Sequence, residues 1–165
     1  MLAPRFLAAV LLSALTAGPV AALSCMPYAP QQAFQDASTS PDPYVIVHGK
    51  LSFNPADLPK GFDERGGGPT EETLFTASMV GFSLTAAGFN NRFIRNIKVH
   101  AACAGPWCAT LETGEDYLLF LKKVGQNYLL EITPCPGFSF LNPSAEVLND
   151  IHQCLLGEAC TPPQF

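Results

Sequence analysis

Charged residues are scarce in this sequence, and the basic ones form no cluster. Lys and Arg number 9 and Asp and Glu number 14 among 165 residues, which gives a net charge of −5. Proteins that bind nucleic acid gather Lys and Arg into a patch or stripe that neutralises phosphates. The scattered basic residues and the net negative charge therefore argue against a nucleic-acid partner.

Catalytic motifs are also missing. The three histidines, His48, His100 and His152, are far apart in the sequence, and there is no Gly-x-Ser-x-Gly or His-Glu-x-x-His. These motifs mark a serine nucleophile on a sharp turn and a zinc-binding helix. Without them we expect no enzymatic activity and no cofactor.

Long apolar runs are confined to the first residues of the chain. One positive charge in Met1 to Arg5, an apolar run from Phe6 to Ala14 and small residues at Val20-Ala21-Ala22 predict a signal peptide cut after Ala22. No later stretch reaches the roughly 18 apolar residues of a membrane span. We therefore expect a signal peptide at 1–22 and an exported protein, periplasmic or secreted, with no membrane span.

The exported part is long enough for one domain, which we place at 23–165. Cleavage leaves 165 − 22 = 143 residues and removes one basic residue, so the charge becomes 8 − 14 = −6. There is no N-glycosylation sequon, because Pro143 blocks Asn142-Pro143-Ser144, which is compatible with a bacterial protein. Lipid attachment would make Cys25 the first residue, but Ala22-Leu23-Ser24 is a poor lipobox, so we expect no anchor there.

Strands and turns dominate the expected structure. The chain has 15 prolines and 13 glycines, and Val45 and Val47 alternate with neighbours of the opposite face. Gly49 interrupts this alternation and predicts a bulge or a sharp bend. The expected strands are Tyr44 to Phe53, Leu74 to Thr85, Arg92 to His100, Tyr117 to Val124 and Asn127 to Thr133.

Two helices and one long loop complete the prediction. Pro30 to Ala37 forms a short helix, and a second helix covers 143–156, with Asn142 as its N-cap, Pro143 in its first position and Gly157 at its end. The loop 54–72, rich in Pro and Gly, is either a functional segment or a tolerated insertion.

The cysteines indicate an oxidising compartment. Six remain after cleavage, most simply as three disulfides, but six cysteines allow 15 pairings and the spacing does not choose among them. His100, Cys103 and Cys108 could instead be zinc ligands, although no fourth ligand stands nearby. A redox role for Cys-Ala-Gly-Pro-Trp-Cys is disfavoured, because redox motifs have two residues between the thiols and this segment has four.

Two segments resemble a known family. The start Cys-x-Pro-x-x-Pro-Gln-x-Ala-Phe at 25–34 and the strand ending in Ile-Thr-x-Cys at 132–135 resemble the N-terminal OB-fold (netrin-like) domain of the tissue inhibitors of metalloproteinases. The resemblance implies an all-β fold, a five-stranded Greek-key OB-like barrel stapled by disulfides, to which the two predicted helices are added. The family cysteine after Ala-Phe is replaced here by Gln35.

The resemblance also orders the cysteines. In the family the two segments are joined by a disulfide, which implies Cys25–Cys135 and leaves the local pairs Cys103–Cys108 and Cys154–Cys160. The Cys103–Cys108 turn would hold Trp107 as a plug at a barrel end; the alternative is an exposed anchor for a partner.

The resemblance finally implies a function. Family members present the amine and carbonyl of a first cysteine to the catalytic zinc of a protease, and a disulfide holds that cysteine. Here the first residue after cleavage would be Leu23, which has no such tether, so the expected protease-facing edge is Leu23, Ser24 and Cys25. We expect a non-catalytic, metal-free protein-binding module; the alternative is a metalloprotease inhibitor that uses the Leu23 amine.

Overall fold

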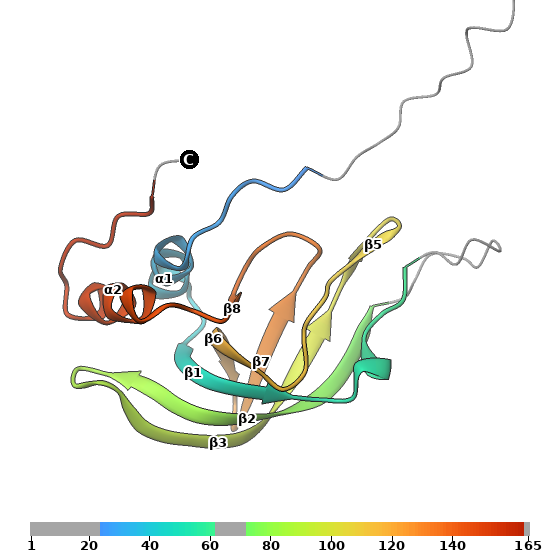
Figure 1. The fold of residues 1–165 in the computed structure, drawn as a ribbon, viewed down its shortest axis with the longest axis horizontal. Coiled ribbons are helices and arrows are strands. Elements are labelled where there is room, and N and C mark those ends of the chain that lie inside the picture. Colours follow the sequence, from blue (N-terminus) through green and yellow to red (C-terminus); the bar gives the residue numbers. More distant parts are fainter. Residues whose placement is uncertain (1–23, 62–71, 164–165) are drawn as a thin grey trace, which may run out of the picture.

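The computed structural model describes residues 24–61 and 72–163, so the expected signal peptide, Leu23 and most of the loop 54–72 lie outside it. Figure 1 shows a mostly β fold with two helices to one side of a curled sheet. The helices are α1 (Pro30–Thr39) and α2 (Ala145–Leu155), and a 3-10 turn covers Pro55–Asp57. The strands are β1 (Tyr44–Ser52), β2 (Thr73–Thr85), β3 (Gly88–Ala101), β4 (Cys103–Ala104), β5 (Trp107–Cys108), β6 (Glu115–Val124), β7 (Asn127–Ile132) and β8 (Ser139–Leu141).

Five strands pair in a closed ring, in the order β1-β2-β3-β7-β6 and back to β1. The β3–β7 pairing is parallel and the other ring pairings are antiparallel. The ring strands are the five expected from the sequence, with ends that differ by a few residues. β3 begins early, at Gly88, because only Ala86 and Ala87 separate it from β2. β8 pairs with β6 outside the ring, and β4 and β5 form a separate hairpin.

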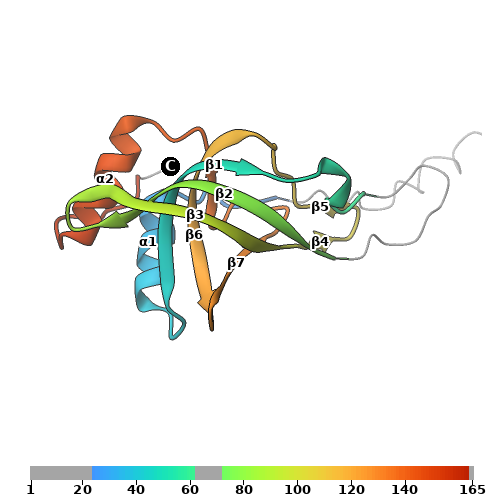
Figure 2. The same cartoon turned by 90° about the horizontal axis from the view of Figure 1, so that it is seen from below.

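The core has two parts, which share β6. Tyr117, Leu119 and Leu121 face the interior of the ring, whereas Leu118 and Phe120 face the helices. β6 is therefore buried on both faces, which explains its unbroken apolar run. Ala33 and Ala37 of α1 and Ile151 of α2 close the second cluster. Figure 2, seen from below, shows β2 and β3 in front, on the side that the helices leave uncovered.

The backbones of β1 and β2 approach closely at a pair of glycines. Gly49 lies directly opposite Gly81, and a Cβ added to either would overlap backbone atoms of the other strand. The expected bulge at Gly49 is absent, since the β1–β2 register runs through it without a shift. A register shift occurs instead in the β2–β3 pairing, between Ser83 and Leu84. The lack of a side chain at Gly49 thus allows β1 and β2 to approach closely and does not mark a bulge.

The ends of α2 correct one prediction and agree with another. The N-cap is Ser144, whose hydroxyl accepts a hydrogen bond from the backbone N–H of Val147 at 3.2 Å, and not Asn142. Pro143 therefore precedes the N-cap and is not the first helical residue, which is Ala145. Asn142 has a left-handed backbone (φ 46°) and donates its N–H to the Asp116 carbonyl instead. At the other end Gly157, with φ 83°, follows the last residues of the helix. Its N–H bonds to the Cys154 carbonyl and that of Glu158 to Gln153, which is a Schellman motif.

Candidate functional site

Three disulfides staple the described part of the chain, which contains no free cysteine. They join Cys25 to Cys135, Cys103 to Cys108 and Cys154 to Cys160, with Cα–Cα distances of 5.3, 4.0 and 4.8 Å. These are the pairs that the resemblance implies. The zinc alternative at His100, Cys103 and Cys108 fails because both thiols are oxidised. Three disulfides also indicate an oxidising, exported environment.

Two of the disulfides lie at one end of the molecule, which we call the staple end. It comprises Ser24 to Tyr28, the β4–β5 hairpin and the turn from Thr133 to Phe138. The hairpin is attached to the end of β7, since the Ala102 N–H donates to the Ile132 carbonyl at 2.9 Å. Figures 1 and 2 show the N-terminal segment and the hairpin projecting toward the same side.

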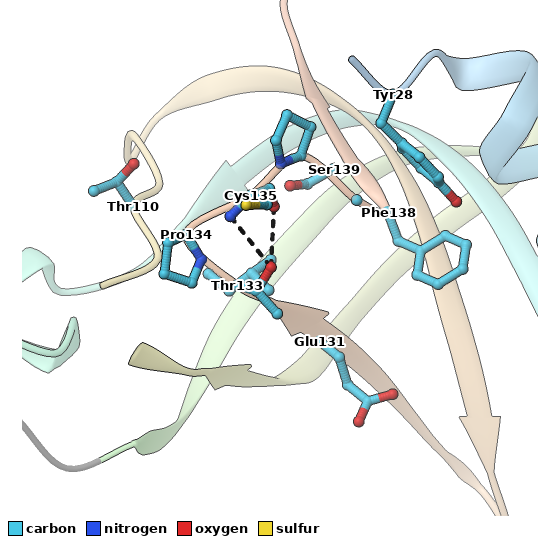
Figure 3. Close-up of a pocket in the computed structure, with 11 residues that line it drawn as sticks. Tyr28, Thr110, Glu131, Thr133, Pro134, Cys135, Phe138 and Ser139 are labelled. Carbon is cyan, nitrogen blue, oxygen red and sulfur yellow. Dashed lines mark hydrogen bonds between the residues drawn. The ribbon is translucent and has the colours of Figure 1, made fainter. Parts of the chain in front are cut away.

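A groove of about 530 Å³ opens along the turn after β7, and its lining includes Tyr28 and Thr110 but no residue of the β4–β5 hairpin. In Figure 3 its floor is the turn after β7, with Tyr28 on one side and Thr110 on the other. The turn is internally bonded: the Thr133 hydroxyl accepts from the Cys135 N–H at 3.3 Å and lies 3.1 Å from the Cys135 carbonyl. The disulfide partner of Cys25 therefore sits on a preformed turn.

Tyr28 fixes the segment at a second point. Its hydroxyl donates to Asp36 Oδ2 at 2.6 Å, and its ring stacks on Phe140 with centroids 6.4 Å apart. Burial and the neighbouring Asp36 carboxylate raise the pKa of Tyr28 well above its usual range, so the hydroxyl stays neutral. Between these anchors Met26 is 84 % exposed. The chain therefore holds a large apolar side chain in solvent on a segment tied down at both ends.

The hairpin presents a second exposed apolar side chain. Trp107 is 38 % exposed, so its indole is partly covered and partly open to solvent, which lies between the expected plug and the alternative of an exposed anchor. Gly105 makes the tight turn with φ 60°, and a Cβ added there would lie 3.8 Å from the Trp107 ring. The Cys103–Cys108 bridge thus holds part of the indole at the surface.

The structure places the residues expected at the protease-facing edge only in part. Cys25 is half-buried in its disulfide, Ser24 is exposed, and Leu23 lies outside the described residues. Met26 and Tyr28 were not among the residues expected at this edge. The Cys-Met-Pro-Tyr-Ala-Pro motif marks the segment, but the partners of Tyr28, Asp36 and Phe140, are not apparent from the motif itself.

The titratable side chains of residues 24–61 and 72–163 form no cluster that could hold a metal ion. No group of three or more His, Cys, Asp or Glu side chains comes together there. The histidines are separate: His48 packs on Phe89, His100 bonds Glu72 at 2.9 Å, and His152 bonds the Ala86 carbonyl at 3.0 Å. The same residues include no helix long and apolar enough to cross a membrane.

The staple end therefore combines a groove with two exposed apolar side chains, Met26 and Trp107, each one residue from a disulfide cysteine. Comparison with known proteins adds no identity to this geometry: no protein-family model, no curated protein and no solved structure matches the chain significantly.

Proposed function

We propose that this protein is an exported, non-catalytic OB-like module of the metalloproteinase-inhibitor-like type that binds a partner protein with its staple end. The observation that carries the proposal is the exposure of Met26 on a segment anchored by Cys25–Cys135 and by Tyr28. A metalloprotease is one candidate partner, since that is what the resembling family binds.

The strand connectivity supports the OB-like assignment. When only the ring strands are numbered along the chain, the pairing order is 1-2-3-5-4-1, with the third and fifth strands parallel. A five-stranded Greek-key barrel closes with few exposed edges and presents its binding loops at the ends. The staple end lies at one end of the ring, because the β4–β5 hairpin follows β3 and the turn from Thr133 to Phe138 follows β7.

Rigidity supports a binding role for this end. Association costs free energy for every side chain and loop that becomes ordered, so a preformed apolar surface binds better than a loose one. Both Met26 and Trp107 lie close to disulfides, and Met and Trp are enriched at protein interfaces. Two large apolar side chains, each one residue from a disulfide, are thus exposed at this end, and this supports a role in recognition.

We expect the variants Met26→Ser and Trp107→Ser to weaken partner binding by about tenfold or more each, because buried apolar anchors dominate interface energetics. The partner is captured from the exported fraction with the unaltered protein, and the affinities of the variants are then measured by surface plasmon resonance. The control is Leu155→Ser, which removes from α2 an apolar side chain that is about as exposed as Trp107. Equal affinity for all three variants would contradict the proposal.

Zinc chelation through the Leu23 amine remains the second candidate. Its support is that the Cys25 bridge is in place and that Ser24, the first described residue, is exposed. Without a tether on Leu23, however, ordering that residue costs roughly 1–2 kcal/mol of backbone entropy.

An extension of one residue before Leu23 separates the two candidates. An inhibitor of the family type loses all activity, because the free amine moves off the metal, whereas a general binding module keeps its affinity. We expect unchanged binding to the captured partner, and no stoichiometric inhibition across a metalloprotease panel by the unextended protein. Inhibition that disappears with the extension would establish the second candidate.

A further inference from the structure

The long strand β3 has a largely open edge. It pairs with β2 over its whole length, but with β7 only from Lys98 to Ala101. In the part of the chain that the structure describes, no strand pairs with the second edge of β3 from Phe89 to Ile97. An open edge presents unpaired N–H and C=O groups, which are a template for an added strand.

Within β2 and β3 the charged side chains have one sign, whereas the carboxylate of Glu72, next to the start of β2, pairs with His100. β2 and β3 contain no Asp or Glu, although the whole chain has a net charge of −5. β3 instead carries Arg92, Arg95 and Lys98. On the outer face Arg92 lies opposite Phe82, and Val80 lies between Lys50 of β1 and Ile94. Val80, Phe82 and Ile94 are 48, 47 and 40 % exposed, so apolar and basic side chains alternate there.

Basic side chains flank the edge on both faces of the sheet. Arg92 and Lys98 belong to the outer face, whereas Arg95 shares the face of Phe93 and Ile97. Phe93 and Ile97 are buried but Arg95 is exposed, with its Nη1 donating to the Ile94 carbonyl at 2.8 Å. A ligand that lies flat on the sheet meets one face only. A strand that runs along the edge meets all three cations.

A groove of about 480 Å³ lies at the end of the open edge, where β7 begins to pair with β3. Lys98 lines it together with the apolar side chains Leu74, Tyr128 and Leu129, and with the His100–Glu72 pair. A bound strand that reaches Lys98 could place an apolar side chain in this groove. The edge, its cations and the groove thus form one continuous surface.

We propose that the open edge of β3 binds an extended acidic segment of a partner protein as an added strand. Nine residues, Phe89 to Ile97, at about 3.3 Å per residue accommodate a segment of about nine residues. A second copy of the chain fits poorly, because edge-to-edge pairing would bring its own arginines together. A polyanion or an anionic lipid could pair with the cations but would leave the unpaired backbone N–H and C=O groups of the edge without strand partners. This surface is distinct from the staple end.

The test uses a fluorescein-labelled peptide of about nine residues, which is the length of the open edge. Its sequence alternates Glu with Val or Thr and ends in Leu. Fluorescence anisotropy measures its binding to the full exported chain. We expect Arg92→Glu combined with Arg95→Glu to weaken binding by about tenfold or more, because like charges then face the peptide. The control is Lys60→Glu, compared with Arg92→Glu alone, because it makes the same charge change at an exposed site outside β2 and β3. We expect less than about a threefold effect from the control, because distant charges are screened.

A second readout distinguishes strand addition from simple charge attraction. Two peptides are N-methylated at alternate residues, one at the odd and one at the even positions, so each loses the N–H donors of one edge of its strand. The peptide that loses the donors facing β3 should bind at least about tenfold more weakly, and the other should bind almost normally. Equal binding of both peptides, tighter binding of an oligonucleotide or anionic vesicle, self-association of the chain, or no binding would each overturn the proposal. Trp107→Ser should leave peptide binding unchanged, so a failed staple-end function would not affect this result.

Discussion

Replacement of both Cys25 and Cys135 by serine is expected to lower the free energy of unfolding by about 4–5 kcal/mol. The bridge spans 110 residues of sequence, and in the chain-entropy model a longer closed loop restricts the unfolded chain more strongly. Equilibrium urea unfolding of the exported chain, with matched baselines, measures the change. Using serine at both positions leaves no free thiol to form wrong pairs.

The Cys103–Cys108 bridge provides the comparison, because it spans only 5 residues. The same double replacement there should cost about 2 kcal/mol in the same model. The two losses should therefore differ by a factor of about two. Equal losses would show that the N-terminal segment is held by its packing around Tyr28 and not by the disulfide, and the rigidity argued for Met26 would then rest on Tyr28 alone.

The ring strands could be predicted from the sequence because their signal is local. Phe75, Ala77 and Met79 alternate with polar neighbours in β2, and the structure buries all three. A strand buried on one face has this period whatever it pairs with. The order of the strands has no such local signal, since the parallel β3–β7 contact joins segments about thirty residues apart and depends on the hairpins between them.

The helix end that was predicted wrongly shows how tertiary contacts decide between local candidates. Asn142 and Ser144 are both good N-cap residues, two positions apart. The Asn142 N–H is taken by the Asp116 carbonyl at the start of β6, which fixes its backbone before the helix begins. Ser144 is then the first residue free to cap.

The side chains of both proposed surfaces were hardest to predict. Exposure of Trp107 depends on what packs against the hairpin, and its sequence fits a plug and an anchor equally well. The basic residues look scattered because Lys50 and Arg92 are 42 positions apart in the chain. They come onto one face only through the β1–β2 and β2–β3 registers. A surface assembled by strand pairing has no sequence spacing of its own.

The largest effect of a single substitution is expected at the crossing of β1 and β2. In Gly81→Ala the new Cβ would overlap the carbonyl oxygen of His48 and lie 2.7 Å from the Cα of Gly49. These are backbone atoms, so no change of rotamer relieves the contact, and one strand must move. We expect a loss of about 3 kcal/mol or more in the free energy of unfolding.

This strand crossing matters because it allows the ring to close. Gly49 pairs with Gly81 on one side and with Tyr117 of β6 on the other, so a displacement of β1 disturbs both pairings. The matched control is Gly137→Ala, where a Cβ meets nothing within 4 Å, and its unfolding free energy should stay within about 0.5 kcal/mol of the original. Urea unfolding of both variants gives the comparison. If the Gly81→Ala protein were as stable as the Gly137→Ala protein, β1 and β2 would not approach closely at this point. That result would contradict the strand contact that allows β1 to pair with both β2 and β6.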